Sequence, residues 1–410
     1  MSRPIIARQP VLDRNKSVVA FELIYRDKKY REDSFKDMKF TAGQINEDMR
    51  FAEESNLLDG KKIFLNFDMK FLKSEISDLI FKEQLGIEIS NTINLDSTVL
   101  DSLNKLKNEG SLIIINLIDF KNINEKIFSQ ADLIKIDFER LQKDDHKSLI
   151  NKLKMGYQNL KFFAENIDNH ENFKAAKETG YDYFQGDFFT KPDIIPEREV
   201  PGYKLNYLKL LKELNKEDLD FDNLENIIKN DMSMTVSLLS MINSAYYGYK
   251  VSSIKQASAL LGVKGLKKWS LIYLVEGLQN DKPDILFVNA LTRAKFAEAL
   301  AEDFGIKKKS GDLFTAGIFS MMDAFMDRPL SEVLKKVPLT DQVKNALLQN
   351  KGLFAEILML VKAFEKADWS KISNITKNYS LKEEKLYSKY LQSVDFAYET
   401  MNDLMSEANL

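Results

Sequence analysis

The chain has 410 residues, and its 59 Lys and Arg against 62 Asp and Glu give a formal net charge of -3. This length accommodates two or three domains, and the near-neutral charge gives no electrostatic reason to expect nucleic acid or an anionic membrane as partner. Cys is absent, and the two His, His146 and His170, fall in different charged segments. Disulfides, thiolate nucleophiles and histidine-built zinc sites are therefore excluded, and any metal must be held largely by oxygen.

Both His are expected to lie on the surface, because their neighbours are mostly charged. The first residues lack the apolar core of a signal peptide, and no apolar run approaches the roughly 18 residues that span a bilayer. We therefore expect a cytoplasmic protein.

The first half of the chain alternates short apolar runs with longer charged stretches. Two apolar-rich segments, 5–11 and 17–26, flank a polar turn and predict a β-hairpin. Six runs follow it: Ile63–Asn66, Leu85–Ile89, Leu112–Leu117, Leu133–Ile136, Leu160–Phe163 and Tyr183–Phe184. The alternation predicts an α/β fold with parallel strands, and the six runs together with the hairpin are enough to close a TIM-like barrel.

Polar residues recur within or just after these runs. The members of this set are Glu22, Asn66, Glu88, Asp119, Lys135, Glu165 and Gln185. In a parallel barrel they would gather at one rim and form a pocket. Oxygen ligands of this kind suit Mg²⁺, Mn²⁺ or Ca²⁺, and a pair of such ions orients water for attack on phosphorus. The layout is that of a phosphodiester hydrolase.

The second half differs in pattern. Three of the eight Pro fall in the segment 192–201, which should be extended and should end the barrel domain. Beyond it apolar residues recur at helical spacing, as in the segments 271–278 and 357–364. We predict a barrel domain over 1–195, a Pro-rich linker over 196–203 and an all-α domain over 204–410.

The segment FELIYR, 21–26, stands where the EAL family of cyclic di-GMP phosphodiesterases has its Glu-Ala-Leu-x-Arg signature, and residues 3–192 resemble that family. The segments FFAEN and GYDYFQGDFFTKP are the most specific part of the match. The resemblance implies metal ligands at Glu22, Asn66, Glu88, Asp119 and Glu165, a substrate-phosphate contact at Arg26, a lysine near the attacking water at Lys135, and a supporting residue at Gln185.

The departures from the family pattern decide the expected activity. Active members carry two adjacent acids after the central strand, and Ile118 occupies the place of the first, which serves both metals. Asn91 stands in place of a further glutamate. Loss of a shared ligand weakens both ions and the water that they activate, so we expect neither a metal nor catalysis here.

The retained acids also have an interpretation without any metal. A buried carboxylate is unfavourable unless it is paired, and Lys135 is the available partner. Glu22, Glu88, Asp119, Lys135 and Glu165 then form either a buried ion network or an intact metal site. We favour the network, because ion networks produce the same residue pattern as active sites.

The segment Met241–Trp269 resembles the HDOD domain, and the similarity spans about 203–400. That family is similar in fold to HD phosphohydrolases but lacks their metal-binding His-Asp pair. Ser320 and Met321 stand where the pair would be expected. The resemblance implies a signalling or interaction module.

These observations lead to one hypothesis and two alternatives. The hypothesis is a bacterial signalling protein with a degenerate EAL barrel and an HDOD domain, which needs no cofactor and acts through contacts with other signalling proteins. The first alternative is a cyclic di-GMP phosphodiesterase with residual activity that depends on Mg or Mn. The second is a receptor that binds cyclic di-GMP without cleaving it, using Arg26. No nucleic acid or membrane is expected as partner, and the sequence allows a homodimer.

Overall fold

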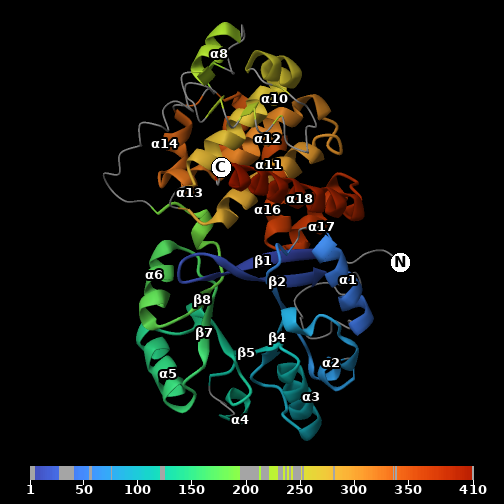
Figure 1. Ribbon diagram of the computed structural model, residues 1–410, viewed down its shortest axis with the longest axis vertical. Helices are drawn as coiled ribbons and strands as arrows, with labels where there is room; N and C mark the ends of the chain where they lie inside the picture. Colours follow the sequence, from blue (N-terminus) through green and yellow to red (C-terminus); the bar gives the residue numbers. More distant parts are fainter. Residues whose placement is uncertain are drawn as a thin grey trace. The chain divides into compact units, whose positions relative to one another are not determined.

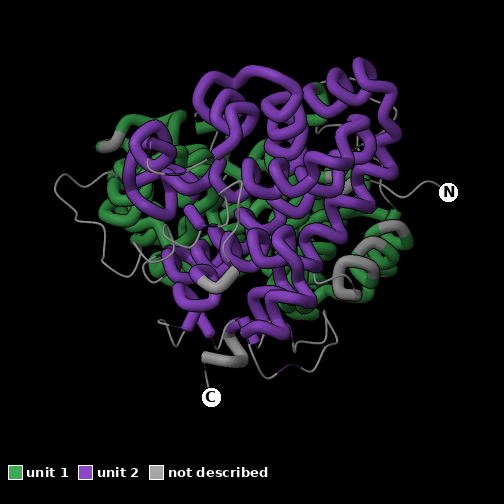
Figure 2. Tube along the Cα trace, turned by 90° about the horizontal axis from the view of Figure 1, so that it is seen from above, with its two compact units in different colours: residues 1–189, 365–370 green, residues 190–364, 371–410 purple. Residues whose placement is uncertain are grey.

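The computed structural model describes residues 5–26, 41–54, 58–74, 76–120, 125–193, 212–213, 221–229, 234–235, 238–239, 242, 251, 254–279, 282–335, 337 and 339–408. The chain divides into two compact units, one of residues 1–189 and 365–370 and the other of residues 190–364 and 371–410, which Figure 2 shows in two colours. Within the described ranges, every helix is too short or too polar to cross a bilayer.

The first unit is built around a closed barrel of eight strands (Figure 1). The strands are β1 (Ile5–Asp13), β2 (Val18–Arg26), β3 (Lys62–Asn66), β4 (Leu85–Ser90), β5 (Leu112–Asn116), β6 (Leu133–Asp137), β7 (Lys161–Glu165) and β8 (Tyr183–Phe184). Strand β1 runs antiparallel to β2 and β8, and the other neighbouring pairs are parallel. The predicted hairpin and the six predicted runs are therefore confirmed as the strands of a barrel.

Helices cover the outside of the strands (Figure 1). They are α1 (Ala42–Glu54), α2 (Met69–Ser74), α3 (Ser97–Asn108), α4 (Glu125–Phe128), α5 (Lys143–Gly156) and α6 (His170–Thr179), with 3-10 turns η2 (Ile76–Asp78), η3 (Lys82–Gln84), η4 (Phe138–Arg140) and η5 (Phe188–Thr190). Polar side chains set where helices begin: Asp96 caps α3 by accepting from the Val99 amide, and Asn169 caps α6 in the same way. Each cap satisfies an amide that the first helical turn leaves unpaired.

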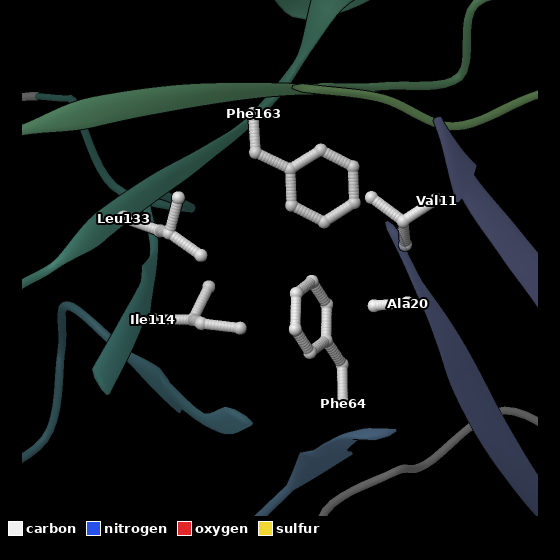
Figure 3. Close-up of a cluster of buried hydrophobic side chains, with 6 residues drawn as sticks. All are labelled: Val11, Ala20, Phe64, Ile114, Leu133 and Phe163. Carbon is white, nitrogen blue, oxygen red and sulfur yellow. The ribbon is translucent and has the colours of Figure 1, made fainter. Parts of the chain in front are cut away.

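The barrel interior contains a cluster of apolar side chains that come from several strands (Figure 3). The cluster consists of Val11, Ala20, Phe64, Ile114, Leu133 and Phe163. The rings of Phe64 and Phe163 meet with their centroids 6.1 Å apart. Gly86 leaves room for this packing, because a Cβ there would lie 2.4 Å from the Phe64 Cδ1 atom. The barrel interior is thus a packed apolar core on the amino-terminal side of the site residues in the parallel strands.

The expectation of a surface position for His146 is wrong. The side chain is 1% exposed and its ring stacks on Phe138. Its Nε2 atom lies 3.1 Å from the Phe138 carbonyl oxygen and therefore carries the proton, so Nδ1 accepts from the Tyr181 hydroxyl at 2.6 Å. The prediction relied on the charged residues next to His146 in the sequence. In the structure His146 and the buried Ile150, four residues apart, lie on the same inward face of α5. His170, at the start of α6, is half-buried.

The described part of the second unit is helical, as predicted. Its helices are α8 (Phe221–Lys229), α10 (Ile254–Gly277), α11 (Asp284–Leu300), η6 (Lys307–Lys309), α12 (Ser310–Phe319), α13 (Met322–Met326), α14 (Leu330–Lys335), α15 (Asp341–Gln349), α16 (Leu353–Glu365), α17 (Trp369–Asn378) and α18 (Glu383–Ala408). Helix α11 packs against both α12 and α18. The approach of α12 is close, because a Cβ on Gly317 would lie 2.4 Å from the Ala294 Cα atom. The predicted linker 196–203 and residues 243–250 lie outside the described residues.

Candidate functional site

Strand geometry brings the candidate residues to one face of the barrel wall. Side chains alternate along a strand, so the residue two positions after an interior apolar residue also points inward. Glu22 follows Ala20 in this way, Lys135 follows Leu133, and Glu88 follows Gly86. Asn66 and Glu165 occupy the equivalent positions of β3 and β7. The polar residues therefore form a layer next to the apolar cluster, toward the carboxyl ends of the parallel strands.

Lys135 lies at the centre of this layer. Its Nζ atom is 2.8 Å from Glu22 Oε2, 3.1 Å from Glu88 Oε1 and 3.1 Å from Glu165 Oε1. The side chains of Lys135 and Glu88 are each 1% exposed, whereas Glu165 is 28% exposed. The structure thus brings together four of the five residues of the predicted ion network, and we refer to these four as the Lys135 cluster.

Burial and mutual charge shift the pKa values in the Lys135 cluster. Burial alone would lower the pKa of Lys135, but the three surrounding carboxylates outweigh it and hold that pKa well above its usual range. Burial, followed by the neighbouring Glu22 charge, raises the pKa of Glu88 to about 8 despite the nearby ammonium. Burial likewise raises the pKa of Glu165. One ammonium therefore faces three carboxyl groups, and the cost of burying their charges falls most heavily on Glu88.

Gln185 closes the cluster beside Glu22. Its Nε2 atom donates to Glu22 Oε2 at 2.8 Å, and the residue is 3% exposed. Its Oε1 atom is buried without a hydrogen-bond partner among the described residues. The following Gly186 has φ 147°, and a Cβ there would lie 2.2 Å from the Ile167 carbonyl oxygen, so only glycine permits this path of the chain. Gln185 thus presents an unsatisfied acceptor inside the barrel.

The loop after β5 is held by Asn91. The Asn91 side chain donates to the Asp119 carbonyl oxygen at 2.7 Å and accepts from the amides of Ile118 and Asp119 at 3.0 and 3.1 Å. Asn91 is 3% exposed, whereas the Ile118 side chain is 43% exposed. Asp119 lies in this loop, outside the set of carboxylates that contact Lys135. Sequence comparison identified Asn91 only as a departure from a family pattern and missed this role.

Two further predicted residues lie at strand ends. Asn66 ends β3, where its backbone is the ladder neighbour of Glu88, and its side chain is exposed. Arg26 ends β2, and its side chain falls outside the described part of the structure. The predicted phosphate contact at Arg26 therefore stays a prediction.

In the helical unit, the position predicted for a His-Asp pair has a different chemistry. Ser320 Oγ accepts from Arg293 Nη1 at 2.9 Å and donates to the Gly317 carbonyl oxygen at 2.7 Å. Arg293 is 7% exposed and Met321 is 1% exposed. Burial raises the pKa of the nearby Asp323. A guanidinium and a thioether thus occupy this place instead of an imidazole and a carboxylate.

The glutamates that the family resemblance implies as ligands of a divalent metal ion contact the Lys135 ammonium in this structure. Mg²⁺ requires oxygen ligands at about 2.0–2.1 Å and Ca²⁺ at about 2.3–2.6 Å. The carboxylate oxygens stand 2.8–3.1 Å from the Lys135 Nζ atom, which is hydrogen-bond spacing around an ammonium. Ile118 supplies no oxygen, and the described residues hold no group of three or more His, Asp or Glu placed for a metal.

Comparison with known proteins defines the class of protein. The EAL domain model matches residues 27–192 and the HDOD domain model matches residues 201–337. The uncharacterized protein YuxH of Bacillus subtilis is 30% identical over 98% of this chain and 99% of its own length. The chain therefore belongs to the family of two-domain proteins in which an EAL domain precedes an HDOD domain.

A second relative has a stated activity. The cyclic di-GMP phosphodiesterase CdgJ of Vibrio cholerae is 27% identical over 89% of this chain and 85% of its own length. Among solved structures, an EAL domain protein from Listeria monocytogenes is 19% identical, with a TM-score of 0.37 over 46% of this chain and 87% of its own. Klebsiella pneumoniae BlrP1, in complex with calcium and cyclic di-GMP, is 17% identical, with a TM-score of 0.37 over 45% of this chain and 54% of its own.

Proposed function

We propose that this chain is a non-catalytic, cytoplasmic signalling protein of the EAL–HDOD family that acts through contacts with other signalling proteins. In this proposal the barrel no longer hydrolyses cyclic di-GMP, and the helical unit has no phosphohydrolase activity. Both units then serve as folded surfaces for regulation rather than as enzymes.

The observation that carries the proposal is the state of the barrel rim. An alkyl side chain, Ile118, stands where active members of the family place an acid shared by two metals. The remaining acids, Glu22, Glu88 and Glu165, are engaged by the Lys135 ammonium at 2.8–3.1 Å. Without two metal ions that activate a water molecule, phosphodiester hydrolysis loses its nucleophile.

The helical unit supports the same conclusion independently. Metal-dependent hydrolysis of the HD type needs imidazole and carboxylate ligands, and the chain has no His after His170. Ser320 and Met321 provide neither ligand type. Arg293 places a positive charge against Ser320, where an HD enzyme would hold a cation.

The alternative is a surviving cyclic di-GMP phosphodiesterase. It is favoured by the activity of the relative CdgJ, which is similar over most of the chain. It is also favoured by the retention of Glu22, Glu88 and Glu165 at the family positions. A receptor that binds cyclic di-GMP without cleavage is the third candidate, and it depends on the Arg26 side chain.

One assay separates the proposal from the first alternative. Purified full-length chain is incubated with cyclic di-GMP and Mg²⁺ or Mn²⁺, with CdgJ as positive control, and the linear dinucleotide is quantified by chromatography. We expect no turnover above that of a metal-free sample. Turnover approaching a typical enzymatic rate of about 10 s⁻¹ would overturn the proposal.

Two variants sharpen the assay at the decisive position. Ile118→Asp returns a carboxylate to the rim, whereas Ile118→Asn has nearly the same shape without the charge. We expect Mn²⁺-dependent turnover in the aspartate variant and none in the asparagine variant. Calorimetry of the wild-type chain with cyclic di-GMP then tests the receptor alternative. Binding without turnover would favour a receptor, whereas no binding would favour a protein that acts without the nucleotide.

A further inference from the structure

We propose that Lys268 is a site of covalent acylation in the helical unit and that the acyl donor is a small acyl phosphate. The inference goes beyond the proposed function, because it does not depend on whether the barrel hydrolyses cyclic di-GMP. It concerns side chains from four helices, which we call the Lys268 cluster: Lys268, Lys295, Glu298, Phe314 and Phe396.

The Lys268 cluster places two amines beside one carboxylate. Lys268 on α10 donates to Glu298 Oε2 at 2.7 Å, and Lys295, one turn before Glu298 on α11, donates to the same oxygen at 3.2 Å. The Lys268 Nζ atom lies 4.6 Å from the centre of the Phe314 ring and 5.1 Å from the centre of the Phe396 ring. Both rings are buried. Two positive charges and one negative charge are therefore held together beside apolar side chains.

This setting makes Lys268 a nucleophile. Burial, opposed by Glu298 and reinforced by Lys295, lowers the pKa of Lys268 to about 8. A lysine that is desolvated beside a second cation reacts as the neutral amine, whose lone pair attacks a carbonyl carbon. Lys268 and Lys295 are half-buried rather than fully buried, so solvent reaches the cluster. A small acyl donor can follow the same route.

The reaction is an acyl transfer. The lone pair of the Lys268 nitrogen forms a bond to the carbonyl carbon of the donor, and the bond between that carbon and the bridging oxygen breaks. Phosphate leaves with the bridging oxygen and the electron pair of the broken bond, and the Lys295 ammonium opposes its negative charge. The nitrogen gives one proton to Glu298, which returns it to solvent. The products are an acyl-lysine and inorganic phosphate.

The acylated side chain has partners for each of its groups in the cluster. An acyl-lysine keeps one N–H, for which Glu298 is the acceptor, and gains a carbonyl oxygen, for which Lys295 is the donor. An acetyl methyl group adds apolar surface beside Phe314 and Phe396. One ammonium and one carboxylate then remain, so the excess positive charge is removed. A carbamate at the same nitrogen would instead add a second negative charge, and the charge balance therefore favours an uncharged acyl group.

The experiment measures acetylation of the folded full-length chain by acetyl phosphate. The reaction is stopped while most chains carry no acetyl group, and fragmentation of the peptides in a mass spectrometer gives the rate at each lysine. Lys264, exposed on the same helix, is the matched control. A parallel reaction with the uncharged N-hydroxysuccinimide ester of acetic acid separates nucleophilicity from recognition of the phosphate group.

We expect acetyl phosphate to modify Lys268 about tenfold faster than Lys264 near pH 8, where half of the Lys268 side chains are neutral. The rate at Lys268 should level off as the pH rises further, because the amine is then fully deprotonated. The preference for Lys268 should be smaller with the uncharged ester. Lys295→Met removes both the neighbouring charge and the phosphate contact, so it should slow acetylation of Lys268 and leave that of Lys264 unchanged.

Three outcomes would contradict the inference: equal rates at Lys268 and Lys264, a Lys268 rate that does not level off, or a rate that Lys295→Met leaves unchanged. An equal preference for Lys268 with both reagents would rule out acyl phosphates as the donor class. Circular dichroism checks the fold of the variant, and Lys295→Gln replaces Lys295→Met if the latter does not fold. The wild-type pH profile decides without any variant, and none of these measurements involves cyclic di-GMP.

Discussion

Two lysines, the buried Lys135 in the barrel and the half-buried Lys268 in the helical unit, have pKa values shifted in opposite directions. Lys135 in the barrel contacts three carboxylates, and its pKa is held well above the usual value. Lys268 in α10 contacts one carboxylate, Glu298 at 2.7 Å, which Lys295 also approaches at 3.2 Å. Burial, opposed by Glu298 and reinforced by Lys295, lowers the pKa of Lys268 to about 8. Desolvation acts on both lysines, and the number of neighbouring carboxylates decides whether the pKa rises or falls.

The two regions also differ in the side chains at the predicted sites. In the barrel, Glu22, Glu88 and Glu165 all contact Lys135. In the helical unit, Ser320 and Met321 supply neither a histidine nor a carboxylate, and the Arg293 guanidinium contacts Ser320. The barrel thus carries acidic side chains around a buried cation, whereas positions 320 and 321 of the helical unit carry none.

The largest expected effect is on the stability of the barrel. Lys135→Met leaves three carboxylates without a countercharge, and removing one partner of a buried ion pair destabilises proteins by about 3–5 kcal/mol. The equivalent Lys268→Met should cost less than about 1.5 kcal/mol, because Glu298 keeps Lys295 as partner and a buried charge disappears. Urea unfolding in EDTA, followed by circular dichroism, measures both. Equal losses of unfolding free energy in the two variants would contradict the difference that we infer between Lys135 and Lys268.

The second prediction concerns pH and Lys268. Its pKa is about 8 in the folded state and 10.5 in the unfolded chain, so between these values the unfolded state binds more protons. The stability contributed by Lys268 is therefore complete above pH 10.5 and is lost as the pH falls to 8. As the pH rises from 8 to 10.5, the unfolding free energy of the wild type should increase relative to that of Lys268→Met by on the order of 3 kcal/mol. A difference that is constant with pH would show that Lys268 titrates normally.

The third prediction tests the close approach of α11 and α12, which fixes the surroundings of Ser320. Gly317→Ala forces a methyl group to 2.4 Å from the Ala294 Cα atom, so a helix must shift. Overpacking of this kind typically costs about 1–3 kcal/mol. Gly311→Ala, in the same helix, meets no atom within 4 Å and serves as the control. A neutral Gly317→Ala would mean that the two helices separate easily.

The smallest effect is expected at the barrel rim loop. Asn91→Ala removes the partner of two amides and one carbonyl group, and the local opening free energy of residues 118 and 119 should fall by about 1–2 kcal/mol. Hydrogen exchange read by mass spectrometry reports this opening directly. Asn104→Ala, an exposed position of α3, should leave exchange in the loop unchanged. Unaltered exchange in both variants would show that the Asn91 side chain does not hold the loop after β5.

Much of the fold follows from short-range pattern. Continuous apolar runs such as 112–117 require burial on both faces, and their alternation with charged helices leaves few arrangements other than a parallel barrel. The meeting of Glu22, Glu88, Lys135 and Glu165 follows from the same logic, since parallel strands end at one rim.

The remaining features depend on contacts that no local pattern specifies. The alternation of side chains ends with β5 at Asn116, so the direction of Asp119 is set by the hydrogen bonds from Asn91, 28 residues earlier. His146 is surrounded by charge in sequence but pairs with Tyr181, 35 residues later. The burial of His146 and the hydrogen bonding of the loop after β5 both depend on side chains distant in sequence.

The central proposal is that the barrel, with Ile118 in place of an acid, no longer hydrolyses cyclic di-GMP. It is tested most directly by measuring cyclic di-GMP turnover of the full-length wild-type chain in Mn²⁺, beside CdgJ under the same conditions. The account predicts that CdgJ produces the linear dinucleotide and that this chain does not exceed a metal-free sample. Turnover by this chain at a rate comparable to that of CdgJ would contradict it.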